Sequence, residues 1–152
     1  MIYFEMKNIE KSFGDLHVLK GISLQVKEGE VLSIIGPSGS GKSTLLRIAT
    51  MLETVDTGEI YYMGEAAVVS EDGVSYYEKP AKLRELKKNF GLVFQNFNLF
   101  PHKTVLDNII DAPISVQKRD KNEVINEAKD LLDKMGLSDK ASYYPSQLSG
   151  GE

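Results

Sequence analysis

The sequence predicts an α/β protein, and three features of the chain lead to this prediction. Short runs near the N-terminus alternate between apolar and polar side chains, as in the run 2–7, which is typical of half-buried strands. A glycine-rich loop lies between a nearly continuous apolar run, 31–35, and an amphipathic helix over 42–52. The last third of the chain has helical periodicity. We therefore expect a mixed core followed by a helical subdomain.

Capping residues and periodicity predict the bounds of the helices and strands. The clearest helix has Asp120 as its N-cap and Gly136 as its C-terminal stop. Thr104 and Asp107 resemble a capping box at the start of another helix. The expected strands are 2–7, 22–26, 31–35, 58–63, 66–69 and 91–95, and the expected helices are 42–52, 79–89, 104–111 and 120–135.

Composition limits the classes of function. The 152 residues are 41% hydrophobic and 26% charged, as in a soluble globular protein. The net charge of -4 gives no basic face for nucleic acid, so we expect no nucleic-acid partner. The chain has no cysteine, which excludes a disulfide framework. No run approaches the length of a membrane span, so any work at a membrane would need a partner protein.

The glycine-rich loop matches the pattern G-x-x-x-x-G-K-[ST], which holds polyphosphates. Its glycines let the backbone curl with N–H groups pointing inward, and the following helix adds its positive end. Lys42 would reach the β- and γ-phosphates, Ser43 would bind Mg²⁺, and Thr44 would donate near the α-phosphate. The predicted nucleotide-binding residues of the loop are Gly36, Pro37, Ser38, Gly39, Ser40, Gly41, Lys42, Ser43 and Thr44.

This pattern predicts a P-loop NTPase core without separating a transporter from a kinase or a GTPase. Its alternative is a surface turn rich in glycine and serine.

The run Leu148-Ser149-Gly150-Gly151-Glu152 narrows the choice. With the upstream loop, it resembles the ABC ATPase family, whose signature is LSGGQ. Glu152 stands where the family has glutamine, at a position not thought to be a main phosphate contact. The resemblance implies that Leu148, Ser149, Gly150 and Gly151 face the ATP of a partner subunit. The alternative is a turn at a helix start with Ser149 as N-cap.

The resemblance also assigns roles to Gln95 and Phe13. Gln95 looks like the glutamine of the family's Q-loop, which contacts Mg²⁺ or the attacking water and senses the transmembrane partner. With Lys42 it would form the catalytic pair present in this chain. Phe13 matches the aromatic residue that stacks on adenine. The alternatives are an ordinary polar strand end for Gln95 and a core side chain for Phe13.

The run 94–106 resembles the polar amino-acid uptake subfamily, of the glutamine and histidine type. This implies an ATP-hydrolysing importer subunit, peripheral on the cytoplasmic face of the cell membrane. Its partners would be a transmembrane permease subunit, a second ATP-binding subunit and, indirectly, an extracytoplasmic amino-acid-binding protein. The run would dock on the permease. Alternatively, Phe97, Leu99 and Phe100 pack the helical subdomain. His102 is interpreted as a structural or surface residue.

The family places an aspartate and a glutamate for Mg²⁺ and water after the signature, and this sequence ends at Glu152. We therefore expect the chain alone to bind ATP with Mg²⁺, to hydrolyse little and to dimerise poorly. Residues 1–95 and 96–152 would be two parts of one domain with an incomplete core and an unpaired sheet edge.

Two further functions remain open: a soluble ABC ATPase of nucleic-acid repair or translation, and a regulatory nucleotide-binding fragment without hydrolysis. The sequence does not specify the transported amino acid.

Overall fold

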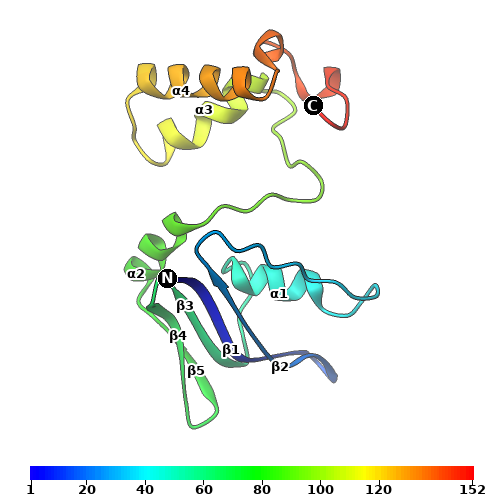
Figure 1. The fold of residues 1–152 in the computed structure, drawn as a ribbon, viewed down its shortest axis with the longest axis vertical. Helices are drawn as coiled ribbons and strands as arrows, with labels where there is room; N and C mark the ends of the chain where they lie inside the picture. The colour runs from blue at the N-terminus through cyan, green and yellow to red at the C-terminus, as the bar shows by residue number, and fades with distance from the viewer. The chain divides into compact units, whose positions relative to one another are not determined.

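The computed structural model describes residues 1–152, which form two compact units, Met1–Leu92 and Val93–Glu152. The first unit contains the sheet with helices α1 and α2, and the second contains helices α3 and α4 (Figure 1). None of the helices combines the length and apolar character that a membrane span requires.

The sheet of the first unit is antiparallel and has the strand order β2-β1-β3-β4-β5. Strand β1 therefore has a neighbour on each side, and Met6 pairs with Leu24 of β2 and with Ile60 of β3. Met6, Ile9 and Ile60 are buried, so one face of the sheet forms the core. The strands are β1 Ile2–Phe13, β2 Leu16–Lys27, β3 Thr57–Tyr62, β4 Glu65–Glu71 and β5 Val74–Tyr77.

Helix α1, Lys42–Ala49, packs on this core through Leu45 and Ile48. Tyr62 of β3 ties the end of the helix to the sheet, because its hydroxyl donates to the carbonyl oxygen of Ala49 at 2.6 Å. Its ring lies 5.1 Å from the ring of Phe4. Helix α2, Pro80–Leu86, continues into the 3-10 turn η1, Lys87–Asn89. The helix expected at 79–89 is thus confirmed as an α-helix with a tighter last turn.

The second unit is built on helices α3, Val105–Ser115, and α4, Lys121–Lys134. Val124, Ala128 and Leu132 recur every fourth residue and are buried, which gives α4 one apolar face. The expected N-cap is confirmed, since Asp120 accepts from the backbone amides of the first turn. Two 3-10 turns follow, η2 Ser138–Lys140 and η3 Pro145–Gln147.

The prediction of strands at 31–35 and 91–95 is wrong. Neither run forms a strand, and Val31, Ile35 and Val93 are 90%, 91% and 95% exposed. A strand with both faces apolar is stable only when neighbouring strands satisfy its backbone groups and cover its side chains. No strand among residues 1–152 pairs with either run, so neither run joins the sheet.

Candidate functional site

The glycine-rich loop is fixed by close packing on strand β2. Gly41 is the N-cap residue of α1 and has a φ of 87°. A Cβ atom there would lie 2.9 Å from Leu19 Cδ2 and 3.0 Å from Val18 Cγ1. Gly39 also has a positive φ, 79°, but faces open space. Glycine is therefore required at Gly41 both for its backbone conformation and for the approach of the loop to the strand.

The ammonium group of Lys42 folds back over the loop that precedes it. Its Nζ donates to the carbonyl oxygen of Gly36 at 2.8 Å and to that of Pro37 at 2.6 Å. The first turn of α1 contains no acidic residue. The positive charge of Lys42 and the positive end of the helix dipole thus lie at the same place without a carboxylate beside them.

Phe13 and the loop line one pocket of about 290 Å³. The ring of Phe13 is 48% exposed, so it is not a core side chain. No carboxylate lines the pocket, and the hydroxyl-bearing Ser43 and Thr44 do. The ammonium group and the hydroxyl groups suit a polyanionic ligand, and the ring of Phe13 suits a flat apolar group on that same ligand. The lining residues are Phe13, Val18, Ser38, Gly39, Gly41, Lys42, Ser43 and Thr44.

Gly36, Pro37 and Ser40 belong to the loop without lining this pocket. Val18 was not among the residues predicted from the sequence. Val18 lies outside the strand expected at 22–26, and the apolar neighbour Leu19 breaks the alternation there, so the sequence carries no signal for it.

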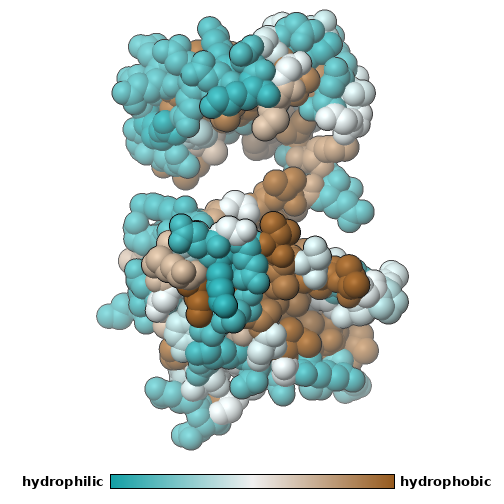
Figure 2. Space-filling model, viewed as in Figure 1, coloured by the Kyte–Doolittle hydropathy of each residue, from teal (hydrophilic) through white to brown (hydrophobic).

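A second hollow in the first unit, of about 260 Å³, has a different character. It lies beside α1 and is lined by apolar side chains that include Phe4, Leu32 and Ile34, with no charged residue. Apolar side chains, shown in brown, gather on the visible face of this unit (Figure 2). Because it lacks any cation, this hollow is unsuited to a phosphate and belongs to the packing of the sheet.

Gln95 and the predicted signature lie in the second unit, whereas the loop and Phe13 lie in the first. Gln95 is in a turn rather than at a strand end. Within the second unit, residues 96–99 and three signature residues, Leu148, Ser149 and Gly150, line one hollow of about 620 Å³. The segment after Gln95 and the signature are therefore neighbours.

Glu152, the residue that departs from the family pattern, folds back onto the signature. Its Oε2 accepts from the backbone amide of Ser149 at 2.7 Å, and its Oε1 lies 3.7 Å from Lys140 Nζ. The hydrogen bonds from Ser149 and the charge of Lys140 lower the pKa of the Glu152 carboxyl. The extra negative charge is thus held within the turn by an amide and a cation.

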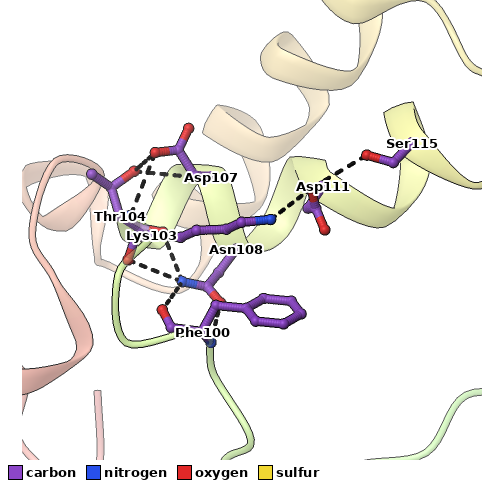
Figure 3. Close-up of polar contacts among 7 residues, drawn as sticks. All are labelled: Phe100, Lys103, Thr104, Asp107, Asn108, Asp111 and Ser115. Carbon is purple, nitrogen blue, oxygen red and sulfur yellow. Dashed lines mark hydrogen bonds and ion pairs between the residues drawn. The ribbon is translucent and has the colours of Figure 1, made fainter.

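The segment before α3 is held by Asn108 (Figure 3). Its side-chain oxygen accepts from the amide of Phe100 at 2.8 Å, and its Nδ2 donates to the carbonyl oxygens of Phe100, Lys103 and Thr104. Thr104 and Asp107 form the expected capping box. Lys103 pairs with Asp111 at 2.8 Å.

This support leaves the apolar side chains of the segment exposed: Phe97 is 70%, Leu99 45% and Phe100 48% exposed. The alternative in which these three side chains are buried inside the helical subdomain does not occur. His102 lies edge-on to the ring of Phe100, with 6.0 Å between the ring centroids.

Comparison with known proteins decides the family. A family model described as ABC transporter matches residues 19–152, a span that contains both the loop and the signature. The chain belongs to the ABC transporter family. The resemblance predicted from the loop and the signature is therefore confirmed, as is the α/β fold class.

Relatives in the ABC transporter family include several amino-acid transport proteins. The chain is 47% identical to an arginine transport ATP-binding protein of Corynebacterium glutamicum, over 99% of this chain and 60% of the relative. It is 45% identical to a glutamine transport ATP-binding protein of Bacillus subtilis, over 100% of this chain and 58% of the relative. The chain thus spans about 60% of the length of these relatives.

Two solved structures of one ABC transporter cassette have the same fold. A dimeric form of the cassette has a TM-score of 0.77 at 34% identity, over 97% of this chain and 64% of that chain. A dimeric form in a post-hydrolysis state, bound to ADP and inorganic phosphate, has a TM-score of 0.76 at the same identity.

Proposed function

We propose that the intact protein is the ATP-binding and ATP-hydrolysing subunit of an ABC importer that energises uptake of a polar amino acid. The observation that carries the proposal is the pocket shared by Phe13, Lys42 and the loop, which has cationic, hydroxyl and aromatic groups and no carboxylate. The arginine and glutamine transport proteins among the relatives support the choice of an amino-acid importer.

Each predicted site residue has a role in this proposal. Lys42 binds the β- and γ-phosphates of ATP, and Thr44 donates near the α-phosphate. Phe13 offers the base an apolar face. Ser43 and Gln95 hold Mg²⁺, which, when bound, offsets the charge of the phosphates. The backbone N–H groups of Gly36, Ser38, Gly39, Ser40 and Gly41 form the cradle around the phosphates. Pro37, which has no N–H, shapes the loop between them.

The second unit supplies contacts to other subunits in this proposal. Leu148, Ser149, Gly150 and Gly151 face the ATP of a second ATP-binding subunit. The exposed side chains of Phe97, Leu99 and Phe100 contact a transmembrane permease subunit, since aromatic anchors concentrate in interfaces. An extracytoplasmic amino-acid-binding protein acts through the permease. The subunit is then peripheral, on the cytoplasmic face of the membrane, and residues 1–95 and 96–152 act as two parts of one domain.

A polypeptide of residues 1–152 on its own binds ATP and hydrolyses little in this account. Phosphoryl transfer to water needs a group that orients the water, and no carboxylate lines the pocket beside Lys42. Turnover by this polypeptide equal to that of the intact subunit, and abolished by Lys42→Ala, would contradict this part of the proposal.

The proposal is tested by purifying the intact subunit and identifying the membrane protein that accompanies it. ATPase activity is then measured with the permease, with and without candidate amino acids and their binding protein. Stimulation by one amino acid, lost in Lys42→Ala, is expected. Stimulation by nucleic acid with no membrane partner would favour the soluble ATPase, and ATP binding without turnover would favour a regulatory role.

A further inference from the structure

Lys11 of β1 is a buried charged residue that lies outside the phosphate loop. It is 7% exposed, and its Nζ lies 3.3 Å from Glu53 Oε1 and 3.4 Å from Asp56 Oδ1. The same nitrogen is 3.4 Å from Thr54 Oγ1. A buried ammonium group is tolerated only with such partners, so its position is fixed by the segment that follows α1.

The same ammonium group lies over the ring of Phe13, with 5.2 Å between Nζ and the ring centroid. Lys11 and Phe13 are two positions apart in β1, and this contact shows that their side chains lie together despite the register irregularity between Lys11 and Ser12. A cation over an aromatic face is attracted to the negative charge of that face. Lys11 therefore holds one face of a ring that is otherwise half-exposed at the end of its strand.

The backbone just before Phe13 is held by the same acidic segment. Asp56 Oδ2 accepts from the amide of Ser12 at 2.6 Å, and the amide of Asp56 donates to the carbonyl oxygen of Glu10 at 3.0 Å. The side chain of Asp56 thus joins the Lys11 ammonium group to the backbone next to Phe13. The end of β1 and the ring of Phe13 are positioned together.

We propose that Lys11 is a positioning residue for the base of the nucleotide, acting through Phe13. The inference rests on the proposed function, in which Phe13 stacks on the base. With Lys11 on one face, a base must stack on the opposite face, and a ring held in place loses less freedom when the base arrives. Lys11 does not contact the pocket and has no role toward the phosphates.

The test compares two ligands, Mg-ATP and inorganic tripolyphosphate with Mg²⁺, binding to the full-length protein by calorimetry. Lys11→Met should weaken ATP binding by about threefold to tenfold and leave tripolyphosphate binding unchanged, since only ATP has a base. Lys7→Met is the matched control. Lys7 also lies in β1, pairs with Glu5 at 3.2 Å and covers the ring of Tyr61 at 4.7 Å, so its loss should change neither affinity.

The Phe13→Ala variant separates this inference from the proposed function. Phe13→Ala should also weaken the binding of ATP and leave the binding of tripolyphosphate unchanged. The double variant with Lys11→Met should bind ATP no more weakly than Phe13→Ala does. If Phe13→Ala weakens ATP binding and Lys11→Met does not, the inference on Lys11 is overturned and the stacking role of Phe13 stands. If Phe13→Ala has no effect on ATP, both are overturned.

A purely structural role of Lys11 is also distinguishable. In that case Lys11→Met would weaken the binding of tripolyphosphate as much as the binding of ATP, and this result would overturn the inference. If Lys11→Met does not fold, Asp56→Asn takes its place, because Asn keeps an acceptor for the Ser12 amide and removes one charge beside Lys11. A smaller loss, restricted to ATP, is expected from this variant, and no loss would overturn the inference.

Discussion

The ammonium group of Lys42 donates to the carbonyl oxygen of Pro37, with 2.6 Å between the two atoms. Lys42 therefore satisfies the loop's own carbonyl groups. A phosphate oxygen that enters the loop competes with these carbonyls and offers the ammonium group a charge-assisted hydrogen bond. In the proposed function, the same lysine would organise the loop before a polyanion binds and would contact the polyanion afterwards.

Gly41→Ala should both destabilise the protein and remove nucleotide binding. The new Cβ would meet Leu19 and Val18 at about 3 Å in a left-handed conformation, which costs about 2–4 kcal/mol in all. Gly39→Ala is the matched control, since its φ is also positive but its Cβ meets open space, and about 1–2 kcal/mol is expected. Urea denaturation measures the free energy of unfolding of both variants. Equal losses of stability in the two variants would show that the packing of Gly41 on β2 does not matter.

Tyr62→Phe should lower the free energy of unfolding by about 1 kcal/mol near neutral pH, because the hydrogen bond to Ala49 is lost. Burial, and then the nearby Tyr77, raise the pKa of the Tyr62 hydroxyl. Above about pH 10 the unfolded chain ionises this group and the folded chain does not, so stability falls as pH rises.

Denaturation at about pH 7 and about pH 11 should therefore show a smaller fall in Tyr62→Phe than in the wild type. Tyr77, whose pKa is also raised by burial, remains in the variant and leaves a residual fall. An identical fall in the two proteins would contradict the account of Tyr62.

Asn108→Ala should weaken association with the permease and leave ATP affinity unchanged. The Asn108 side chain holds the backbone at Phe100 and Thr104, and without it the exposed aromatic segment loses its fixed conformation (Figure 3). Several-fold less permease should accompany the variant on purification. Asn122→Ala, at an exposed position of α4, is the control. Equal recovery of permease with both variants would show that Asn108 does not support the interface.

The Glu152 carboxyl should titrate below the ordinary glutamate pKa of about 4.3. A lowered pKa means that the contact with Ser149 is kept above the ordinary pKa and is lost as pH falls through the lowered one. NMR titration of the carboxyl carbon in the intact protein measures this, and Lys140→Met should raise the pKa toward the ordinary value. An ordinary pKa in the wild type would indicate that the carboxylate does not fold back onto the signature.

Much of the second unit was predictable from the sequence because its signals are local. The helix after Asp120 and the capping box of Thr104 and Asp107 depend on residues three or four positions apart, and both form as expected. The absence of strands at 31–35 and 91–95 was not predictable in this way. An apolar run forms a strand only if a neighbour pairs with it, and that depends on residues far away in the sequence.

Strand β5 was missed although the sequence contains its turn. Asp72 and Gly73 have φ values of 50° and 76° and join β4 to β5, and Asp-Gly is a strong signal for a two-residue hairpin. Within the site, the loop is a local pattern and was found, whereas Lys11 is joined to Glu53 and Asp56 across the fold. No sequence pattern marks such a contact.

Binding of a nucleoside triphosphate in the pocket of Phe13 and Lys42 is the step on which the proposed function depends. Its most direct test is the dissociation constant of Mg-ATP for the wild type, for Lys42→Ala and for Lys20→Ala, an exposed lysine of β2 used as control. Lys42→Ala should weaken binding at least about tenfold, with unchanged circular dichroism, and Lys20→Ala should bind as the wild type does. Equal affinity of Lys42→Ala and the wild type would contradict the account.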